Sequence, residues 1–249
     1  MVATKRLRIF AGPNGSGKST ITNIVSKQVK LGCYVNADEI KKYLVLNRYL
    51  DFTDYRIVLD GEKFTKAFRT STLSHRIEST EETLAHVSFS GTKLLLSDDY
   101  VIEDYFVSFI TFYIWSELLE SSDKFTIETV MSHPSKLEFM RLAKEKGFKV
   151  YLYFVSLVDP ELNQNRVRIR VKQGGHPVDE DKIVTRYNRT MENLYEALKL
   201  ADNAYLFDNS ASAPNMFATK EKGTLTIQSE RIPKWFIAHV IDKTKPIVS

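Results

Sequence analysis

The chain is organised around nine residues close to its start. Gly12 to Thr20 read G-P-N-G-S-G-K-S-T, which fits the phosphate-binding loop pattern G-x-x-x-x-G-K-[ST] at every fixed position. The apolar run from Leu7 to Ala11 precedes this loop and predicts a buried strand, while Ile21, Ile24 and Val25 follow it at helical spacing. Strand, loop and helix are the context that the pattern requires, which disfavours the alternative of a flexible Gly/Ser loop.

In a loop of this kind, glycines let backbone N–H groups turn toward phosphate oxygens, and the helix N-terminus adds a positive partial charge. Lys18 would reach further phosphates, and the Ser19 hydroxyl would bind Mg²⁺. The pattern assigns to the nucleotide the residues Gly12, Pro13, Asn14, Gly15, Ser16, Gly17, Lys18, Ser19 and Thr20. The sequence therefore predicts binding of a nucleoside triphosphate, with ATP as the first choice, together with Mg²⁺.

At 249 residues, the chain is long enough for one well-packed core, and we expect a single domain over residues 1–249. Its 43% hydrophobic and 27% charged residues are ordinary for a globular protein. The net charge of +4 is too mild to require nucleic acid as a partner. The single cysteine, Cys33, excludes an internal disulfide and a thiolate metal cluster, and its apolar neighbours predict that it is buried.

Nothing in the sequence predicts a membrane protein. Residues Met1 to Arg8 are basic but lack the apolar region of a secretory signal. Tyr105 to Ser116 is an uncharged, aromatic run of only 12 residues, which is too short to span a bilayer. We therefore expect a cytoplasmic protein with no membrane partner.

Short apolar strands alternate with amphipathic helices along most of the chain. This alternation predicts an α/β fold, with a mostly parallel sheet flanked by helices on both faces. Strands are expected at Gly32–Asn36, Lys124–Ile127, Lys149–Leu157 and Ala204–Phe207, a helix at Lys136–Lys146, a C-terminal hairpin at Asn215–Ser229 and a short helix at Pro233–Ile241. Asp38 and Glu128 each lie near the end of a strand, at the sheet edge where ligands of such folds bind.

The segment between Leu50 and Asp99 has a weaker pattern. The expected elements are a helix at Glu62–Arg69 and a hairpin formed by Thr83–Ser90 and Thr92–Ser97. Ser97 and Asp98 are expected to cap the next helix, which runs to about Glu120. A second interpretation remains open, in which the aspartates after this apolar strand support a metal ion.

Two further helices, Pro160–Val171 and Asp179–Leu200, are separated by K-Q-G-G-H-P, and glycines between helices predict a mobile hinge or lid over roughly 160–190. Arginines that share a face on each helix are Arg166 with Arg170, and Arg186 with Arg189, whereas Arg168 points elsewhere. Guanidinium groups on a lid would offset the charge on a transferred phosphoryl group. In the competing interpretation, these arginines lie in solvent or in surface ion pairs.

Several of these motifs occur together in one known family. They are F-A-G-P-N-G-S-G-K-S-T at Phe10–Thr20, N-A-D-E-I at Asn36–Ile40, F-T-I-E-T at Phe125–Thr129, R-V-R-I-R-V-K-Q-G-G-H at Arg166–His176, R-Y-N-R at Arg186–Arg189 and L-F-D-N-S at Leu206–Ser210. In this order they resemble the zeta toxin family of P-loop kinases, and more closely its branch of predicted ATPases with A-G-P-N-G-x-G-K-S-T and G-G-H motifs. The resemblance covers most of residues 5–211.

The resemblance implies a nucleotide-kinase-like fold and the ATP- and Mg²⁺-dependent phosphorylation of a hydroxyl group. In the best-known zeta toxins, the acceptor is the sugar of UDP-N-acetylglucosamine. By position, Lys18 and Ser19 would hold the phosphates and the metal, and Asp38 would be the base that accepts the proton of the acceptor. Glu128 and Thr129 fall where the family binds its acceptor.

The resemblance also implies roles for the arginines of the lid. Arg170 and Arg186 would act on the triphosphate in catalysis, Arg189 and then Arg166 would help to bind it, and His176 matches a lid residue of the family. Considered without the family, Asp38 has the alternative role of a helix N-cap, and Glu128 that of a charged strand end facing water.

Two features depart from the family pattern. Zeta toxins follow the acidic acceptor-binding residue with Gly-Thr, and this branch usually with Thr-Thr, whereas here Glu128 is followed by Thr129 and Val130. One hydroxyl that would orient the acceptor is therefore missing, which weakens the assignment of a UDP-sugar. The segment between Asp38 and Glu128 is also longer than usual, and the surplus at about residues 62–99 is expected to reshape the acceptor site or to bind a partner.

The leading hypothesis is an ATP-dependent small-molecule kinase, which an antitoxin protein would hold in check if the chain acts as a toxin. The alternative is a nucleotide-dependent switch or a nucleic-acid-stimulated ATPase, against which stand the mild charge and the lack of a recognisable nucleic-acid module. A third possibility, an inactive scaffold, is weakened because Lys18, Ser19, Asp38 and Glu128 are all present.

Overall fold

The computed structural model describes residues 4–174 and 178–244, and the chain divides into two compact units. Unit 1 comprises the residues up to Leu31 together with those from Glu128 onward, and unit 2 comprises Gly32–Ile127. The phosphate-binding loop lies in unit 1, while most of the segment that was hard to interpret lies in unit 2. That both units form one domain stays a prediction.

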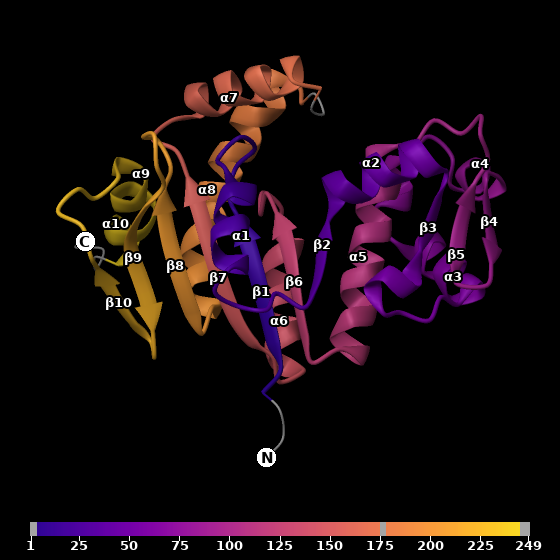
Figure 1. Cartoon of the computed structure of the whole chain (residues 1–249), viewed down its shortest axis with the longest axis horizontal. Helices are drawn as coiled ribbons and strands as arrows, with labels where there is room; N and C mark the ends of the chain where they lie inside the picture. Colours follow the sequence, from indigo (N-terminus) through magenta and orange to yellow (C-terminus); the bar gives the residue numbers. More distant parts are fainter. Residues whose placement is uncertain (1–3, 175–177, 245–249) are drawn as a thin grey trace, which may run out of the picture. The chain divides into compact units, whose positions relative to one another are not determined.

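Unit 1 contains the sheet that carries the loop (Figure 1). Its strands are β1 (Arg6–Ala11), β7 (Lys149–Ser156), β8 (Asn203–Asp208), β9 (Asn215–Glu221) and β10 (Thr224–Ile227), in the order β10-β9-β8-β7-β1. The strands β1, β7 and β8 are parallel, with Ile9 opposite Leu152, whereas β9 and β10 are antiparallel to their neighbours. The strand β6 (Lys124–Thr129) enters this unit with its last two residues, Glu128 and Thr129. The predicted mostly parallel α/β sheet is confirmed.

Helices cover both faces of this sheet (Figure 1). They are α1 (Lys18–Ser26), α6 (Ser135–Glu145), α7 (Pro160–Lys172), α8 (Glu180–Leu200), α9 (Lys234–Phe236), a π-helical turn at Ile237–Ile241, and α10 (Asp242–Thr244). On the α1 face, Ile21 and Val25 pack against Phe10 and Tyr153. Ile24 is 42% exposed, because the helix turns that position toward solvent.

The other face of the sheet is packed by aromatic side chains from the end of the chain. The Phe154 ring lies 5.7 Å from Trp235, and the Phe217 ring lies 5.4 Å from Trp235, measured between ring centroids. All three side chains are buried. The C-terminal hairpin and helix therefore contribute side chains to the core of unit 1.

Unit 2 is held together by a cluster of phenyl and phenol rings. The Phe64 ring packs edge-on against Phe52, Phe109 and Tyr113, with centroids 5.0–6.3 Å apart. These rings come from a 3₁₀ turn at Phe52–Tyr55, from α3 (Gly61–Thr70) and from α5 (Asp104–Ser121). The remaining elements are β2 (Cys33–Asn36), α2 (Ala37–Asn47), a 3₁₀ turn at Ser74–Arg76, α4 (Thr80–Ala85) and an antiparallel sheet of β3 (Tyr49–Asp51), β5 (Lys93–Leu96) and β4 (Val87–Ser90) in the order β3-β5-β4.

Two details of unit 2 differ from the sequence prediction. The hairpin strand begins at Val87 and not at Thr83, because Thr83 is buried within α4. The helix α5 has Glu103 as its N-cap, so the prediction that Ser97 and Asp98 cap it is wrong. Ser97 instead contacts His86, with 2.6 Å between its Oγ and the histidine Nδ1.

The aromatic run that was too short for a membrane span lies in α5, which is apolar on nearly all sides and packed into the core of unit 2. Within residues 4–174 and 178–244, no helix has both the length and the apolar character needed to cross a membrane. Cys33 is buried, as predicted. No group of three or more His, Cys, Asp or Glu side chains that could hold a metal ion occurs among these residues, and the metal interpretation of Asp98 and Asp99 stays a hypothesis.

Candidate nucleotide-binding site

The loop between β1 and α1 follows a path that only glycine allows at two fixed positions. Gly12 and Gly17 have φ angles of +148° and +91°, in the region that side chains rarely adopt. A Cβ atom on Gly12 would lie 1.9 Å from the carbonyl oxygen of Val155, and one on Gly17 would lie 2.1 Å from Nδ2 of Asn209. Strand β7 and the segment after β8 therefore contact the loop backbone directly.

The helix α1 begins at Lys18, so the positive end of its dipole stands at the end of the loop, where the Thr20 amide donates to the Gly17 carbonyl at 3.1 Å. No side chain caps this end, and no acidic residue lies in the first turn. The positive end of the helix dipole is therefore available to an anion. Ser19 and Thr20 are exposed in this turn, and the Ser19 hydroxyl is an oxygen donor that could hold Mg²⁺.

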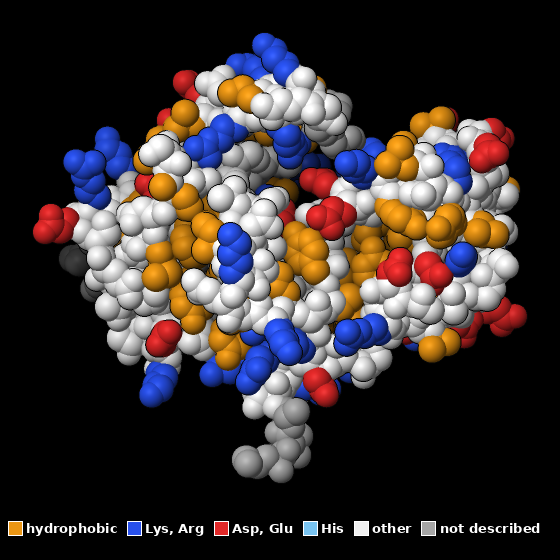
Figure 2. Space-filling model, in the orientation of Figure 1, with side chains coloured by type: hydrophobic (Ala, Val, Ile, Leu, Met, Phe, Trp, Pro, Cys, Tyr) orange, Lys and Arg blue, Asp and Glu red, His pale blue; other side chains and the backbone are white. Residues whose placement is uncertain are grey.

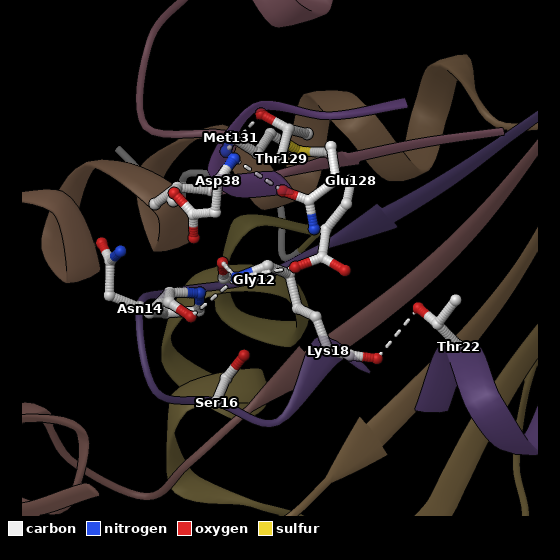
Figure 3. Close-up of polar contacts among 12 residues, drawn as sticks. Gly12, Asn14, Ser16, Lys18, Thr22, Asp38, Glu128, Thr129 and Met131 are labelled. Atoms are coloured by element: carbon white, nitrogen blue, oxygen red, sulfur yellow. Dashed lines mark hydrogen bonds and ion pairs between the residues drawn. The ribbon is translucent and has the colours of Figure 1, made fainter. Parts of the chain in front are cut away.

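Lys18 is folded back over its own loop (Figure 3). Its Nζ donates hydrogen bonds to the carbonyl oxygens of Gly12 and Pro13, at 3.1 and 3.2 Å. The same atom lies 4.0 Å from Oε1 of Glu128, and the two side chains are only 10% and 9% exposed. The structure thus brings together two residues that the sequence predicted to act in one site, and it does so through the end of β6. Glu128 is not the water-facing strand end of the alternative interpretation.

The carbonyl groups of the loop are held from outside by two asparagine side chains that the sequence analysis missed. Asn163 of α7 donates from Nδ2 to the backbone carbonyl oxygen of Asn14 at 2.6 Å. Asn209 donates from Nδ2 to the backbone carbonyl oxygen of Ser16 at 2.8 Å. Asn209 belongs to the L-F-D-N-S motif, which was the available signal in the sequence. Asn163 stands in no motif.

The residues after Glu128 form a fixed turn. The Thr129 hydroxyl accepts a hydrogen bond from the Met131 amide at 3.2 Å, and Met131 has a left-handed φ of 62°. On α8, Thr190 donates to the Val130 carbonyl at 2.8 Å, and Asn193 donates to the Met131 carbonyl at 2.9 Å. The helix α8 therefore sets the position of the turn in which Thr129 lies.

The predicted arginine clamp is only loosely arranged. Arg186 and Arg170 are half-buried and Arg189 is exposed, while Lys and Arg side chains gather over α7 (Figure 2). Arg166 donates to the Asn209 carbonyl at 2.7 Å, so one of its N–H groups serves the loop region and not solvent. Arg168 forms two hydrogen bonds with Glu180, at 2.5 and 2.6 Å, which agrees with its prediction as an outward-facing residue. His176 lies outside the described residues.

The start of α8 is anchored beneath these arginines. The Tyr187 hydroxyl donates to the Leu157 carbonyl at 3.1 Å, at the carboxyl end of β7. Burial raises the pKa of Tyr187 to about 12, although a hydrogen bond with Ser156 opposes this shift. The phenol therefore stays protonated and acts as a donor at any physiological pH.

Asp38, the predicted base, belongs to unit 2. It is the second residue of α2 and is exposed. The N-cap of this helix is Asn36, whose side chain accepts a hydrogen bond from the Asp38 amide at 2.8 Å. The alternative role of Asp38 as the N-cap is therefore wrong, and its carboxylate is not used to start the helix.

Solved structures share this architecture. A chain in the crystal structure of the AvrRxo1-ORF1:AvrRxo1-ORF2 complex matches with a TM-score of 0.53 and 17% identity, over 90% of this chain and 61% of that chain. The same complex solved with ATP also matches with a TM-score of 0.53 and 17% identity, over 91% of this chain and 61% of that chain. The chain therefore shares the fold of these solved structures, one of which was determined with ATP. This fold agrees with the family that the sequence motifs resemble.

The chain spans less than two thirds of the length of those structural neighbours. A weaker likeness, with a TM-score of 0.46 and 14% identity over 86% of this chain and 72% of that chain, is to the PezAT toxin–antitoxin system of Streptococcus pneumoniae. No family model matches the chain. An uncharacterized protein of Haemophilus influenzae is 40% identical over 63 residues, which are 25% of this chain and 45% of that protein.

Proposed function

We propose that this protein is a zeta-toxin-like kinase, which transfers the γ-phosphate of ATP to a hydroxyl group of a small-molecule acceptor. The observation that carries the proposal is the buried pair of Lys18 and Glu128, 4.0 Å apart, beside a loop built for phosphate. A buried cation and carboxylate of this kind are costly to assemble for stability alone, which favours a functional reason for the pair.

The loop would bind the nucleotide through its backbone. The first-turn amides of α1 and the Lys18 ammonium group would contact the β- and γ-phosphates. Lys18 would exchange its hydrogen bonds with Gly12 and Pro13 for phosphate oxygens, which are stronger partners because they are charged. Ser19 would hold Mg²⁺, which neutralises charge on the transferred group.

The acceptor would be activated by Asp38. A carboxylate suits this step because it can accept the hydroxyl proton while the new bond to phosphorus forms. Glu128 and Thr129 would orient the acceptor, and Arg170, Arg186 and Arg189 would offset the charge of the triphosphate. The Thr129 oxygen already accepts one hydrogen bond from Met131, which leaves its O–H donor and one lone pair for an acceptor.

A UDP-N-acetyl sugar is the acceptor that we propose to test first. Purified protein would be incubated with Mg·ATP and a panel of UDP-sugars, nucleosides and aminoglycosides, and the products would be identified by mass. The expected result is one acceptor that gains a phosphoryl group in proportion to the ATP consumed. ATP turnover with no phosphorylated product, stimulated by RNA or DNA, would replace the kinase by the ATPase alternative.

The role of Asp38 has its own test. Asp38→Asn is expected to abolish transfer and to spare ATP binding, whereas Asp98→Asn, which changes another exposed aspartate of unit 2, should leave both unchanged. Transfer that persists in the Asp38 variant would remove it as the base.

We further propose that the protein acts in the cytoplasm and is controlled by an antitoxin protein. The AvrRxo1 and PezAT structures are complexes or systems of two components, which motivates the test. Expression of the wild type alone should slow growth, while the Asp38→Asn variant should not. Equal growth of the two strains would argue against a toxin.

A further inference from the structure

The two asparagines that contact the phosphate-binding loop form a site of their own. A loop that turns its amides toward a ligand turns some carbonyls the other way, and a carbonyl buried in this way needs a donor. The Asn14 and Ser16 carbonyls are in this situation, and each receives a buried side-chain amide, from Asn163 and Asn209 respectively. The contacts join residues 149 and 193 positions apart in the chain.

The backbone of Asn209 is held on both of its polar groups. Its backbone N–H donates to the Ser156 carbonyl at 2.9 Å, and its backbone carbonyl accepts a hydrogen bond from the Arg166 guanidinium at 2.7 Å. Only 6% of its surface is exposed. The end of β7 and the helix α7 thus fix this residue from both sides.

Asn163 is fixed in a similar manner by α7. It is fully buried in the first half of the helix, whose N-cap Asp159 accepts a hydrogen bond from the Leu162 amide at 2.9 Å. A Cβ atom on Gly15 would lie 2.7 Å from the Asn163 carbonyl oxygen. The loop glycines therefore leave room for the two asparagines as much as for a ligand.

We propose that Asn163 and Asn209 are positioning residues of the phosphate site, which hold the loop amides in their binding orientation through the carbonyls of Asn14 and Ser16. The proposal rests on the proposed function only in naming ATP as the ligand; the site itself requires a polyphosphate chain. Arg166 donates a hydrogen bond to the Asn209 carbonyl, so it would support the loop indirectly, by holding Asn209 in place.

The test replaces each amide by a carboxylate of the same shape. In Asn209→Asp and Asn163→Asp, an acceptor oxygen would face the Ser16 or Asn14 carbonyl where a donor stood, and the loop would have to move. Affinity for inorganic tripolyphosphate and for Mg·ATP, measured by calorimetry, is expected to fall by about tenfold or more in each variant. Asn209→Ala, which removes the donor without adding charge, serves if the acidic variant does not fold.

The matched control is Asn193→Asp. Asn193 also donates to a backbone carbonyl in unit 1, that of Met131 at 2.9 Å, but it does not contact the loop. Its acidic variant should lower the melting temperature to a similar extent and leave the affinity for tripolyphosphate unchanged. A control that loses affinity as strongly as Asn209→Asp would show that the loss comes from lowered stability and would overturn the proposal.

Hydrogen exchange decides the matter without any ligand. The loop amides of residues 14–19 should exchange faster in Asn209→Asp and Asn163→Asp than in the wild type or in Asn193→Asp. Wild-type exchange in both loop variants would overturn the positioning role. A wild type that binds neither ATP nor tripolyphosphate would instead remove the proposed function, and the exchange measurement would still decide whether the asparagines order the loop.

Discussion

The phosphate-binding loop and the arginine-bearing helices lie in the same unit but are built in opposite ways. In the loop, Lys18 is buried and bonded to its own backbone, and the carbonyls on the outer side are held by asparagines. On α7 and α8, by contrast, Arg189 is exposed and Arg168 is paired with Glu180 at the surface. One region is ordered before any ligand arrives, whereas the other still has side chains to order.

This difference indicates where binding energy would come from. A preformed loop has no ordering cost at the moment of binding, so it suits the tight grip on phosphates. Exposed arginines lose side-chain entropy when they close on a ligand, and they are best used where charge develops during the reaction. We therefore expect the loop to determine the affinity for the nucleotide and the arginines to determine the rate of phosphoryl transfer.

The largest expected effect breaks the loop side of the comparison. Lys18→Ala removes the buried cation beside Glu128 and should lower phosphoryl transfer by about 10³-fold. Lys27→Ala, at the exposed C-cap of α1, is the matched control and should have no effect. Transfer and ATP binding would be measured for both, and a Lys18 variant within tenfold of the wild type would refute the role.

The next effect is on stability. Gly12→Ala would place a Cβ 1.9 Å from the Val155 carbonyl and should lower the free energy of unfolding by about 3 kcal/mol. Gly223 also has a positive φ, of +83°, but no atom lies within 4 Å of the new Cβ, so Gly223→Ala should cost only about 1 kcal/mol. Urea unfolding compares the two, and equal losses would show that backbone strain and not the contact decides.

The arginine side is tested by Arg170→Ala, with Arg168→Ala as the control on the same helix. The Arg170 variant should lower kcat by about 10²-fold, with little change in the affinity for ATP. The Arg168 variant loses surface contacts with Glu180 and Asn165 and should keep kcat. If both variants lowered ATP affinity instead of kcat, the separation of affinity from rate would fail.

The smallest expected effect is on stability and concerns Asp202, at the edge of the sheet away from the loop. It measures the contribution of a contact that has no role in the proposed reaction. Burial favours the neutral form of Asp202, but its bonds with Lys144 Nζ at 2.7 Å and the Val150 amide at 2.8 Å outweigh this, so the pKa of Asp202 is lowered. A lowered carboxyl pKa contributes stability at neutral pH, and this contribution is lost as the pH falls through the folded-state pKa.

Asp202→Asn should therefore lower the melting temperature by about 2–4 °C at neutral pH, and by less in acid. Thermal unfolding of both proteins across the acid range measures the difference. Phosphoryl transfer should not change, because Asp202 lies before β8, at the edge away from the loop. A constant difference in melting temperature at every pH would contradict the assigned pKa shift.

Much of the fold could be predicted because the responsible patterns are local. The strand before Gly12, the helix from Lys18 and the long apolar strand β7 follow from periodicity over a few residues. The start of α5 was placed too early because Ser97 and Asp98 are good caps in any sequence, and only the packing of unit 2 shows that the helix begins at Asp104.

The candidate site divides in the same way. Lys18 and Glu128 could be predicted because each stands in a short motif that identifies its chemistry. The asparagine contacts could not, since a partner 149 or 193 residues away leaves no local pattern, and asparagine has many ordinary uses in loops and caps.

The hydroxyl of Thr190 has a consequence for how the arginines could reach a ligand. Its oxygen lies 2.6 Å from the Arg186 carbonyl oxygen and 2.8 Å from that of Val130, and its one hydrogen is shared between them, so the helical turn that bears Arg186 lies against the residues that follow Glu128. Arg186 would then reach a triphosphate by rotation of its own side chain, while the helical turn that bears it stays in place. The length of the Arg186 side chain, more than a movement of α8, would determine how long a phosphate chain must be to contact both the loop and this arginine.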